Sequence, residues 1–436
     1  MWPYYPELLE TPVPRYTSYP TAADFGRIPS RALDEAIEQA SGVISLYLHI
    51  PFCEKICYYC GCNTGASSRR QRVKSYLSAL HEEIAVVSSK LPEHVRVGRI
   101  AFGGGSPNAI SASDFLGLVN SIHRHFRLKN AAWSVELDPR SMTAEWGRAL
   151  GQAEITRASM GVQTFAPHCQ KAIGREQSDK LICQSIDWLR TSGVTSMNFD
   201  LMYGLPHQTP DDLADSLEYT KLLGADRVAV FGYAHVPHLI PRQRIIDGQP
   251  MPERGERFTM AMQAFDYLTH SGYQAVGFDH FALPNDPLAI AARQGSLRRN
   301  FQGFTDDTSD ILIGMGASSI SMFPHLIAQN EKNNGRYRML SSQASLSAST
   351  GIIRTPEDTM RAKFIEGLLC TGRANWPQPM LADIQERLQP FVAKGLATLD
   401  GGTVSVTPDG LPYARVIAAI FDPYRAKTIR RFSSAI

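Results

Sequence analysis

The sequence VISLYLHIPFCEKICYYC, residues 43–60, places three closely spaced cysteines directly after a strand-like apolar run. Residues 43–50 are mostly apolar or β-branched, a pattern typical of a short buried strand. Cys53, Cys57 and Cys60 follow with the spacing C-x3-C-x2-C, and Cys62 stands two residues further on. Open α/β sheets bind ligands at the carboxyl ends of their strands. The stretch therefore predicts a thiol-bearing loop at the ligand-binding edge of an α/β fold.

Short apolar runs alternate with helical patterns on the carboxyl side of this strand. This alternation predicts βαβ units, a parallel sheet and a partial or complete (β/α) barrel. Ser111 and Thr209 begin patterns typical of helix N-caps. The expected strands are 43–50, 97–103, 133–138, 155–162, 195–202 and 226–234. The expected helices are 71–90, 111–126, 141–152, 178–192, 210–223 and 255–271.

We divide the chain into an N-terminal segment (1–42), an α/β barrel (43–290), a connecting and barrel-closing region (291–350) and a C-terminal domain (351–436). The last part is expected to be mostly helical, with a winged-helix-like hairpin. We place its helices at 356–370 and 378–394, a hairpin at 396–406, and a final helix opening at 407–409. Because this part is not strongly basic, we favour a packing role over DNA binding.

The composition is that of an ordinary globular protein, with 436 residues, 43% hydrophobic and 20% charged. This excludes a disordered chain. The formal net charge is only +2, which disfavours nucleic-acid binding through bulk charge. No apolar run reaches the roughly 18 residues of a membrane span. The amino-terminal residues lack a signal-peptide pattern, so a cytoplasmic protein without membrane insertion is expected.

The cysteine cluster predicts a soft metal site. Thiolates select zinc, Cu(I) or iron–sulfur clusters, and three of them can hold three corners of a [4Fe–4S] cubane with one iron left open. Cys62 is compatible with a fourth ligand, a zinc ligand or a residue outside the site. Zinc is disfavoured because structural zinc sites usually pair two hooks that are separated in sequence. The scattered Cys169, Cys183 and Cys370 are expected to be core thiols.

Further polar or glycine-rich positions follow the other expected strands. Residues 103–107, GGGSP, follow the second strand, and glycines there allow the backbone to approach a ligand closely. Glu136 closes the third strand, Gln163 closes the fourth, and Asp200 lies late in the fifth. Arg175 is a candidate partner for a carboxylate. Side chains at successive strand ends converge on one barrel mouth, so these residues predict a single binding site.

The motif C-x3-C-x2-C with aromatic Tyr59 before its last cysteine resembles the radical S-adenosylmethionine (SAM) superfamily. Within it, the chain resembles the oxygen-independent coproporphyrinogen III oxidase (dehydrogenase) family. The stretches that carry this likeness are PRYTSYPT (14–21), YLHIPFC (47–53), CGCN (60–63), NFQG (300–303) and GMG (314–316). The sequence departs from the family pattern at Val13 and Leu283.

The resemblance implies one [4Fe–4S] cluster and two SAM molecules. It implies Cys53, Cys57 and Cys60 as cluster ligands, with Cys62 as a non-ligand. We expect Cys62 and Tyr47 to be the catalytic residues. The positions that match the first SAM site are Tyr47, Gly104, Glu136 and Ile320. Those that match the second are Tyr59, Gly105, Ser106, Gln163, Arg175, Asp200 and Ala234.

The implied reaction is the anaerobic conversion of two propionates of coproporphyrinogen III to vinyl groups through a 5′-deoxyadenosyl radical, which gives protoporphyrinogen IX in haem biosynthesis. Its implied partner is an external one-electron reductant such as flavodoxin or ferredoxin, and a monomer is expected. The substrate carries four propionates, so we expect contacts from Arg15, Arg298, Arg299 and Gln302. The N-terminal segment is expected to cover the barrel mouth. Two alternatives are a haem chaperone and a radical SAM methyltransferase or ring-opening enzyme.

Overall fold

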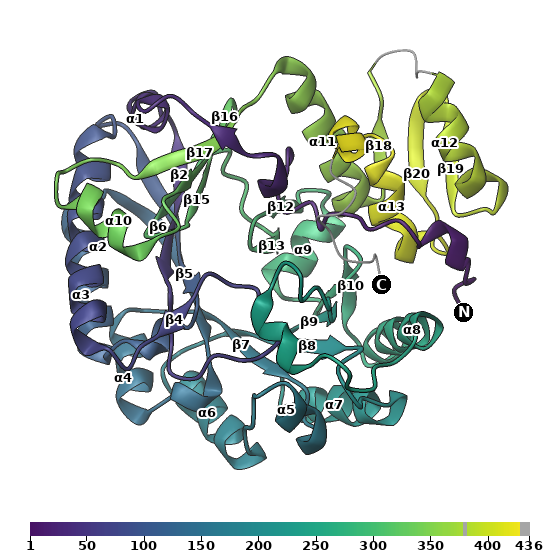
Figure 1. The fold of residues 1–436 in the computed structure, drawn as a ribbon, viewed down its shortest axis with the longest axis horizontal. Helices are drawn as coiled ribbons and strands as arrows, with labels where there is room; N and C mark the ends of the chain where they lie inside the picture. Colours follow the sequence, from purple (N-terminus) through teal and green to yellow (C-terminus); the bar gives the residue numbers. More distant parts are fainter. Residues whose placement is uncertain (378–381, 428–436) are drawn as a thin grey trace.

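Seven neighbouring parallel strands form the centre of the fold in the computed structural model, which describes residues 1–377 and 382–427 (Figure 1). In sheet order they are β14 (Leu312–Met315), β2 (Val43–Ile50), β5 (Arg96–Gly104), β6 (Leu128–Leu137), β7 (Arg157–Gln163), β8 (Ser196–Tyr203) and β9 (Arg227–Gly232). The sequence predicted six of them and missed β14. The partial (β/α) barrel expected from the alternating pattern is thereby confirmed.

Antiparallel strands extend the sheet at both edges. Next to β14 stand β15 (Ile320–Met322), β16 (Leu326–Asn330), β17 (Ala348–Ile353) and β1 (Gly26–Arg27); next to β9 stand β11 (His280–Ala282) and β10 (Gln274–Val276). Strands β14, β15 and β16 of the 291–350 region thus lengthen the sheet beside β2, and no strand in the described part of the chain joins its two ends. Two small ribbons pair β3 (Phe52–Cys53) with β4 (Gly65–Ala66), and β12 (Arg298–Asn300) with β13 (Gly303–Thr305).

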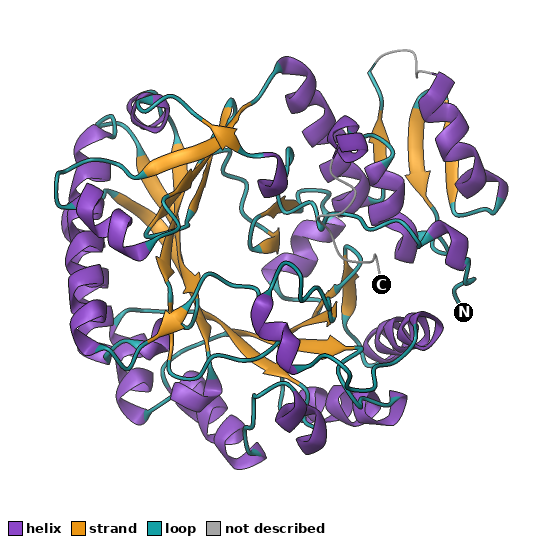
Figure 2. Cartoon of the chain, viewed as in Figure 1, coloured by secondary structure: helices purple, strands orange, loops and turns teal. Residues whose placement is uncertain are grey.

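Helices cover the outer side of the curved sheet, as Figure 2 shows. The crossover helices are α2 (Arg70–Lys90), α3 (Ala112–His125), α4 (Ala144–Gln152), α6 (Asp179–Thr191), α7 (Pro210–Leu222) and α8 (Arg254–His270); shorter ones are α1 (Ala32–Glu38), α5 (Pro167–Ala172), α9 (Pro287–Arg293) and α10 (Asn334–Ser341). The predicted N-caps are confirmed. Ser111 accepts a hydrogen bond from the Asp114 amide, and Thr209 accepts one from the Asp212 amide.

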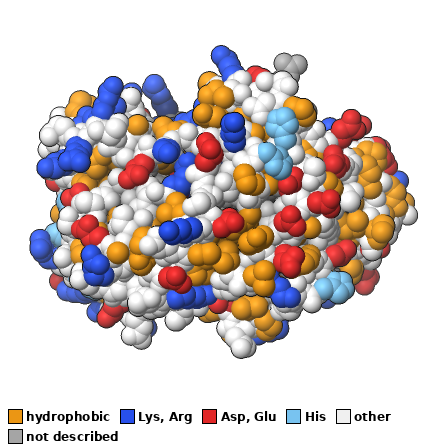
Figure 3. All heavy atoms as spheres, turned by 90° about the horizontal axis from the view of Figure 1, so that it is seen from below, with side chains coloured by type: hydrophobic (Ala, Val, Ile, Leu, Met, Phe, Trp, Pro, Cys, Tyr) orange, Lys and Arg blue, Asp and Glu red, His pale blue; other side chains and the backbone are white. Residues whose placement is uncertain are grey.

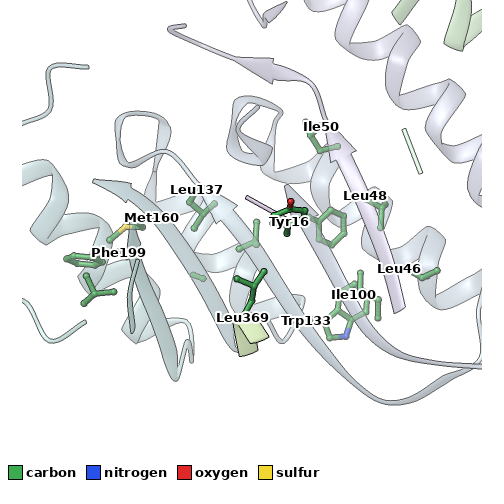
Figure 4. Close-up of a cluster of buried hydrophobic side chains, with 14 of the residues drawn as sticks. Tyr16, Leu46, Leu48, Ile50, Ile100, Trp133, Leu137, Met160, Phe199 and Leu369 are labelled. Atoms are coloured by element: carbon green, nitrogen blue, oxygen red, sulfur yellow. The ribbon is translucent and has the colours of Figure 1, made fainter. Parts of the chain in front are cut away.

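One continuous core joins the barrel to the segments at both ends of the described chain. Figure 4 shows Ile100 and Trp133 on β5 and β6, and Met160 and Phe199 on β7 and β8. Tyr16 and Leu369 lie in the same cluster although they come from outside the parallel strands. Burial of such side chains stabilises the fold by about 1.5–3 kcal/mol each. The ends of the described chain are therefore packed onto the barrel.

The C-terminal residues form helices around a three-stranded sheet. Their elements are α11 (Pro356–Thr371), β18 (Arg373–Asn375), α12 (Ala382–Ala393), β19 (Ala397–Asp400), β20 (Thr403–Val406) and α13 (Ala414–Ala419). The predicted hairpin is confirmed, whereas β18 was missed. Positions 378–381 of the second predicted helix lie outside the described residues. The predicted helix start at 407–409 is wrong, because Thr407 instead closes a turn through its hydroxyl and carbonyl to the Gly410 amide.

The N-terminal segment is held against the C-terminal residues by hydrogen bonds. The Tyr5 amide donates to the Tyr413 hydroxyl at 2.8 Å, and that hydroxyl donates to the Pro3 carbonyl. The Tyr16 hydroxyl donates to Asp422 at 3.0 Å, and this carboxyl is almost fully buried. Burial raises the pKa of Asp422 to about 6. Its ionisation is therefore unfavourable in the folded chain.

We expect Asp422 to make stability fall as the pH rises. A carboxyl whose folded pKa exceeds its unfolded value of about 3.9 stabilises fully below that value and loses the contribution as the pH passes the folded pKa near 6. Between pH 4 and 7, Asp422→Asn should therefore gain on the order of 2 kcal/mol in free energy of unfolding relative to the parent chain. Anaerobic urea titrations at both pH values measure this difference. Parallel pH profiles for the two proteins would contradict it.

Surface charges of both signs are interspersed on the face that Figure 3 shows, with apolar side chains between them. This distribution accords with the almost equal numbers of basic and acidic residues, 44 and 42. Among the described residues, no helix is both long and apolar enough to cross a membrane.

Candidate active site

The cysteine loop follows β2 and faces a large cavity of the barrel, about 570 Å³ in volume. Cys53, Cys57, Cys60 and Cys62 all line this cavity. All seven cysteines lie in the described part of the chain and are free thiols. The loop is fixed at its two ends, because β3 pairs with β4 and the Tyr58 amide donates to the Ile173 carbonyl. The fold thus presents several unpaired thiols to one cavity, as the spacing predicted.

Two arginines approach the sulfur of Cys57. Arg140 Nη2 lies 3.2 Å from this Sγ and Arg175 Nη1 lies 3.3 Å from it. Asp138 joins the two guanidinium groups, at 2.7 Å from Arg140 and 3.3 Å from Arg175. Burial alone would raise the pKa of Asp138, but Arg175 and Arg140 lower it below its usual value. The ionised carboxylate holds two cations beside a thiol that must become a thiolate to bind metal.

Cys60 and Cys62 interact with each other. The Cys62 amide donates to the Cys60 sulfur at 3.4 Å. Hydrogen bonding from Cys62 lowers the pKa of Cys60 to about 6, while the same pairing raises the pKa of Cys62 well above its usual value. Burial also raises the pKa of Cys53 to about 11. Cys60 therefore ionises more readily than Cys53 or Cys62.

Glycines at the end of β5 let the backbone pass the cysteine loop closely. Gly104 has a φ of +117°, and a Cβ there would lie 2.6 Å from the His49 ring. A Cβ at Gly105 would lie 2.6 Å from the Phe52 carbonyl oxygen. The Gly105 amide donates to the Ile50 carbonyl, so this approach also ties β5 to β2. A side chain at either position would clash with these neighbours, so glycine is required at both. Both residues line the large cavity.

Two half-buried carboxyls, on β6 and on β8, face the same cavity. Glu136 on β6 accepts hydrogen bonds from the Gly104 amide at 3.2 Å and from Gln302 at 3.3 Å. Asp200 on β8 accepts them from Ser159 at 2.9 Å and from Asn198 at 2.8 Å. Burial raises the pKa of each carboxyl. Such groups can accept hydrogen bonds from the ammonium or hydroxyl groups of a ligand.

The structure brings most of the predicted site residues to the large cavity. Gln163 ends β7 in the left-handed region with a φ of +70°, and Arg175 donates to the Gly161 carbonyl two residues before it at 2.9 Å. Tyr59 contributes its ring to the wall between the cysteines. The predicted residues that line this cavity are Arg15, Cys53, Cys57, Tyr59, Cys60, Cys62, Gly104, Gly105, Glu136, Gln163, Arg175, Asp200 and Gln302.

Four predicted site residues do not line the large cavity. Tyr47 is buried in β2, with its hydroxyl 3.2 Å from His49 Nδ1 and its ring against Phe301. Ile320 lies on β15, where its carbonyl faces Gly314 of β14. Ser106 is buried and donates to Asn108, which in turn bonds the backbone of Asp138. Ala234 follows β9 and lines a second cavity, of about 330 Å³.

The arginines predicted to contact substrate occupy different surroundings. Arg15 borders the large cavity and donates to the Gly232 carbonyl at 3.2 Å. Arg298 forms ion pairs with Glu366 at 3.1 Å and Asp310 at 3.2 Å, away from the cysteine loop. Arg299 is buried, donates to the carbonyls of Arg15 and Tyr16, and lies 4.3 Å over the Phe304 ring. Neither Arg298 nor Arg299 lines the large cavity.

Sequence reasoning missed several charged residues of the site. Nothing in the sequence marked Arg140 as a site residue, because a single arginine after a strand is common. At the amino ends of the strands, Arg99 and Arg157 form ion pairs with Asp306, at 2.9 and 2.8 Å. Arg99, Arg157, Asp306 and Asp307 all line the cavity from that side. Leu283, where the family pattern has a different residue, packs against the main core.

The residues present fit an iron–sulfur cluster bound by three thiolates. Three thiols reach one cavity from a loop whose ends are fixed, and two guanidinium groups offset negative charge at Cys57. Metal binding displaces thiol protons, so even the Cys53 thiol is a competent ligand. The adjacent glycines, Glu136 and Asp200 provide backbone and carboxylate acceptors for a polar cofactor.

Comparisons with known proteins agree with this geometry. The radical SAM superfamily model matches residues 47–220. The chain is 38% identical over 431 residues to the oxygen-independent coproporphyrinogen III oxidase of Bradyrhizobium diazoefficiens, covering 95% of each chain. It is 35% identical to that of Escherichia coli, covering 97% of this chain and 96% of the relative.

A solved structure shows the same fold over almost the whole chain. Coproporphyrinogen III oxidase from Escherichia coli, described as a radical SAM enzyme, superposes with a TM-score of 0.90 at 34% identity. The match covers 97% of this chain and 99% of that one. Identity of this extent over full length confirms the resemblance found in the sequence. The chain belongs to the oxygen-independent coproporphyrinogen III oxidase family of the radical SAM superfamily.

Proposed function

We propose that this protein converts two propionate side chains of coproporphyrinogen III to vinyl groups without oxygen. The observation that supports this best is the thiol loop facing a large cavity in a chain related over its full length to enzymes named for this substrate. Radical SAM proteins use a [4Fe–4S] cluster and SAM. When bound, these cofactors supply a 5′-deoxyadenosyl radical by one-electron cleavage of SAM.

The chain's own residues bind and position the reactants. Cys53, Cys57 and Cys60 would hold the cluster, and the pair Arg140–Arg175 would balance its negative charge. Cys62 lines the cavity and lies outside the ligand trio, so its thiol would be placed to donate a hydrogen there, which accords with a catalytic role for it. Glu136 and Asp200 would accept hydrogen bonds from SAM. The surrounding protein excludes water and oxygen from the radical chemistry.

The finer assignments are part of the same proposal. We propose two SAM molecules, because the predicted SAM positions extend over the large cavity and, through Ala234, to a second one. Tyr47 and Ile320 would position the first SAM from the wall behind the cavity. An external one-electron donor such as flavodoxin or ferredoxin would reduce the cluster of a monomeric protein. A reducing cytoplasm suits these free thiols.

Anaerobic turnover tests the proposed function. The reconstituted protein is incubated with SAM, dithionite and coproporphyrinogen III, and the products are identified by mass spectrometry. We expect carbon dioxide, 5′-deoxyadenosine and a tetrapyrrole with two vinyl groups. Intact substrate without carbon dioxide would instead support a haem chaperone, and a methylated or ring-opened product would support another radical SAM activity.

A further inference from the structure

Exposed positive charges are concentrated in and just after the cysteine loop. From residue 55 to residue 81 the sequence contains no aspartate or glutamate. It contains five lysines and arginines there, all exposed, which together we call the basic surface: Lys55, Arg69, Arg70, Arg72 and Lys74. In the whole chain, basic and acidic residues are almost equal in number, 44 and 42. The excess of positive charge is therefore a local feature of this segment.

Neighbouring carboxylates do not balance these charges. Among the described residues, no ion pair includes a side chain of the basic surface. Lys74 lines an open groove between α2 and α10 together with Arg338, and Glu82 is the one carboxylate that the described residues contribute to this groove. Positive charge thus continues from α2 toward α10, which lies beside it (Figure 1). An anionic partner would meet several cations that are not paired within the described chain.

The basic surface does not serve the stability of α2. Amides at a helix N-terminus carry partial positive charge, so acidic side chains there stabilise a helix and basic ones destabilise it. The first turns of α3, α4, α6 and α7 each contain an acidic residue, whereas the first turn of α2 contains none. Arg70 and Arg72 stand in that turn instead. Charges placed against local stability point to a role outside the folding of the chain.

The basic surface is tied to the backbone of the cysteine loop. The Ser67 amide, two residues before Arg69, donates to the Cys53 carbonyl at 3.0 Å. Asn63, in the same loop, donates through its side chain to the carbonyl of Lys332 at 3.0 Å. Lys332 is exposed and precedes α10. A protein that contacts the start of α2 would therefore lie against the loop that carries the proposed cluster ligands.

The proposed reaction needs an electron at this loop from outside the chain. Electron transfer between proteins slows steeply with distance, so the donor must dock close to the cysteines. Complexes of this kind are transient and have small interfaces, and charge complementarity steers the encounter of the two proteins and sets their orientation. An exposed surface of unpaired cations next to the cysteine loop fits a donor protein whose own surface is acidic.

We propose that the basic surface is the docking site of an acidic one-electron donor protein. The donor is oxidised by one electron and the bound [4Fe–4S] cluster is reduced by one, from the 2+ to the 1+ state, without transfer of a proton or any other atom. This inference rests on the proposed function, which requires an external reductant, and deepens it by assigning the place at which that partner docks.

Charge reversal at the start of α2 tests this docking site. The double variant Arg69→Glu/Arg72→Glu places acidic residues where a helix N-terminus favours them, so the fold is retained. The matched control, Arg148→Glu/Lys221→Glu, makes the same change in net charge at exposed positions of α4 and α7. Anaerobic calorimetry of each reconstituted holoenzyme with an oxidised flavodoxin and with an oxidised [2Fe–2S] ferredoxin measures the dissociation constants. We expect the reversal variant to bind the donor about 10- to 100-fold more weakly, and the control to differ from the parent protein by less than about twofold.

Turnover with two kinds of reductant separates docking from the chemistry. With excess dithionite, a small reductant that needs no protein docking, 5′-deoxyadenosine formation by the reversal variant should equal that of the parent protein. With limiting reduced flavodoxin or ferredoxin it should be about 10- to 100-fold slower, and Arg69→Lys/Arg72→Lys, which keeps both charges, should match the parent protein. Higher ionic strength should weaken donor binding to the parent protein and reduce its difference from the reversal variant.

Four results would overturn the inference. They are a parent protein that binds neither donor, unchanged donor affinity in the reversal variant, an equal loss of affinity in the control, and a raised KM for coproporphyrinogen III with dithionite. The last result would make the basic surface a steering site for the carboxylates of the substrate. Failure of the proposed function is distinguishable, because the parent protein with dithionite would then release no carbon dioxide, while calorimetry still measures donor binding.

Discussion

Cys53→Ala is expected to abolish cluster assembly and with it all SAM cleavage, whereas Cys62→Ala is expected to retain the cluster. Loss of one of three thiolates leaves a cubane with two protein ligands, which the loop cannot hold. Cys62 is different because it lies outside the C-x3-C-x2-C trio that we propose as the cluster ligands. Anaerobic iron and sulfide analysis, with absorption near 400 nm, measures the cluster content. Formation of 5′-deoxyadenosine measures SAM cleavage.

Cys183→Ala is the matched control, because this cysteine is exposed on α6 and does not line the large cavity. It should keep parental iron content and activity. Cys62→Ala should lose decarboxylation if its thiol acts as a hydrogen donor, while still cleaving SAM. Loss of iron from Cys62→Ala would show that Cys62 is a ligand. Full iron content in Cys53→Ala would refute the proposal that Cys53, Cys57 and Cys60 are the three cluster ligands.

Asp138→Asn is expected to lower the free energy of unfolding of the apoprotein by about 3 kcal/mol at pH 7, because it removes the anion between two largely buried arginines. The pKa of Asp138 is lowered in the folded chain, so its contribution is present above the unfolded pKa of about 3.9 and disappears as the pH falls through the folded value. The difference should therefore stay constant between pH 6 and 8. Anaerobic urea unfolding measures it.

The same variant should also weaken the cluster site. Arg140 and Arg175 would lose the carboxylate that orients them toward Cys57, so cluster loss to a chelator should be faster than in the parent protein. Asp215→Asn, at an exposed position on α7, is the control and should change stability by less than about 0.5 kcal/mol. Equal stability of Asp138→Asn and the parent protein would contradict the structural role given to this carboxylate.

The sequence was sufficient to predict the parallel strands that have strong local patterns. Residues 43–50 and 196–203 are eight-residue stretches in which apolar residues predominate, so their strands could be placed almost to the residue. By contrast, β14 has only four residues, one of them a glycine, and its pairing with β2 joins positions more than 260 residues apart. No local pattern carries that pairing. The seventh parallel strand was therefore missed.

Local patterns also misled where tertiary contacts decide the conformation. Thr407-Pro408-Asp409 has the sequence of a helix start, but the next residue, Gly410, passes so close to Leu396 that a Cβ there would lie 1.8 Å from its carbonyl oxygen. The chain turns at this point, and α13 begins only at Ala414.

The residues of the site were likewise only partly predictable from the sequence. Cysteine spacing and strand ends predicted the cavity residues, because such positions converge in any parallel barrel. Arg140 could not be found in this way, since it is a single arginine in an ordinary loop context. Its importance arises from the carboxylate of Asp138, which holds it beside Cys57.

Mössbauer spectroscopy of the ⁵⁷Fe-reconstituted protein, with and without SAM, tests most directly whether three thiolates leave one iron of a cubane open. We expect a [4Fe–4S] spectrum in which SAM changes the signal of one iron site, in the parent protein and in Cys62→Ala alike. A cubane whose four irons are all insensitive to SAM, or a protein that assembles no cubane, would contradict it.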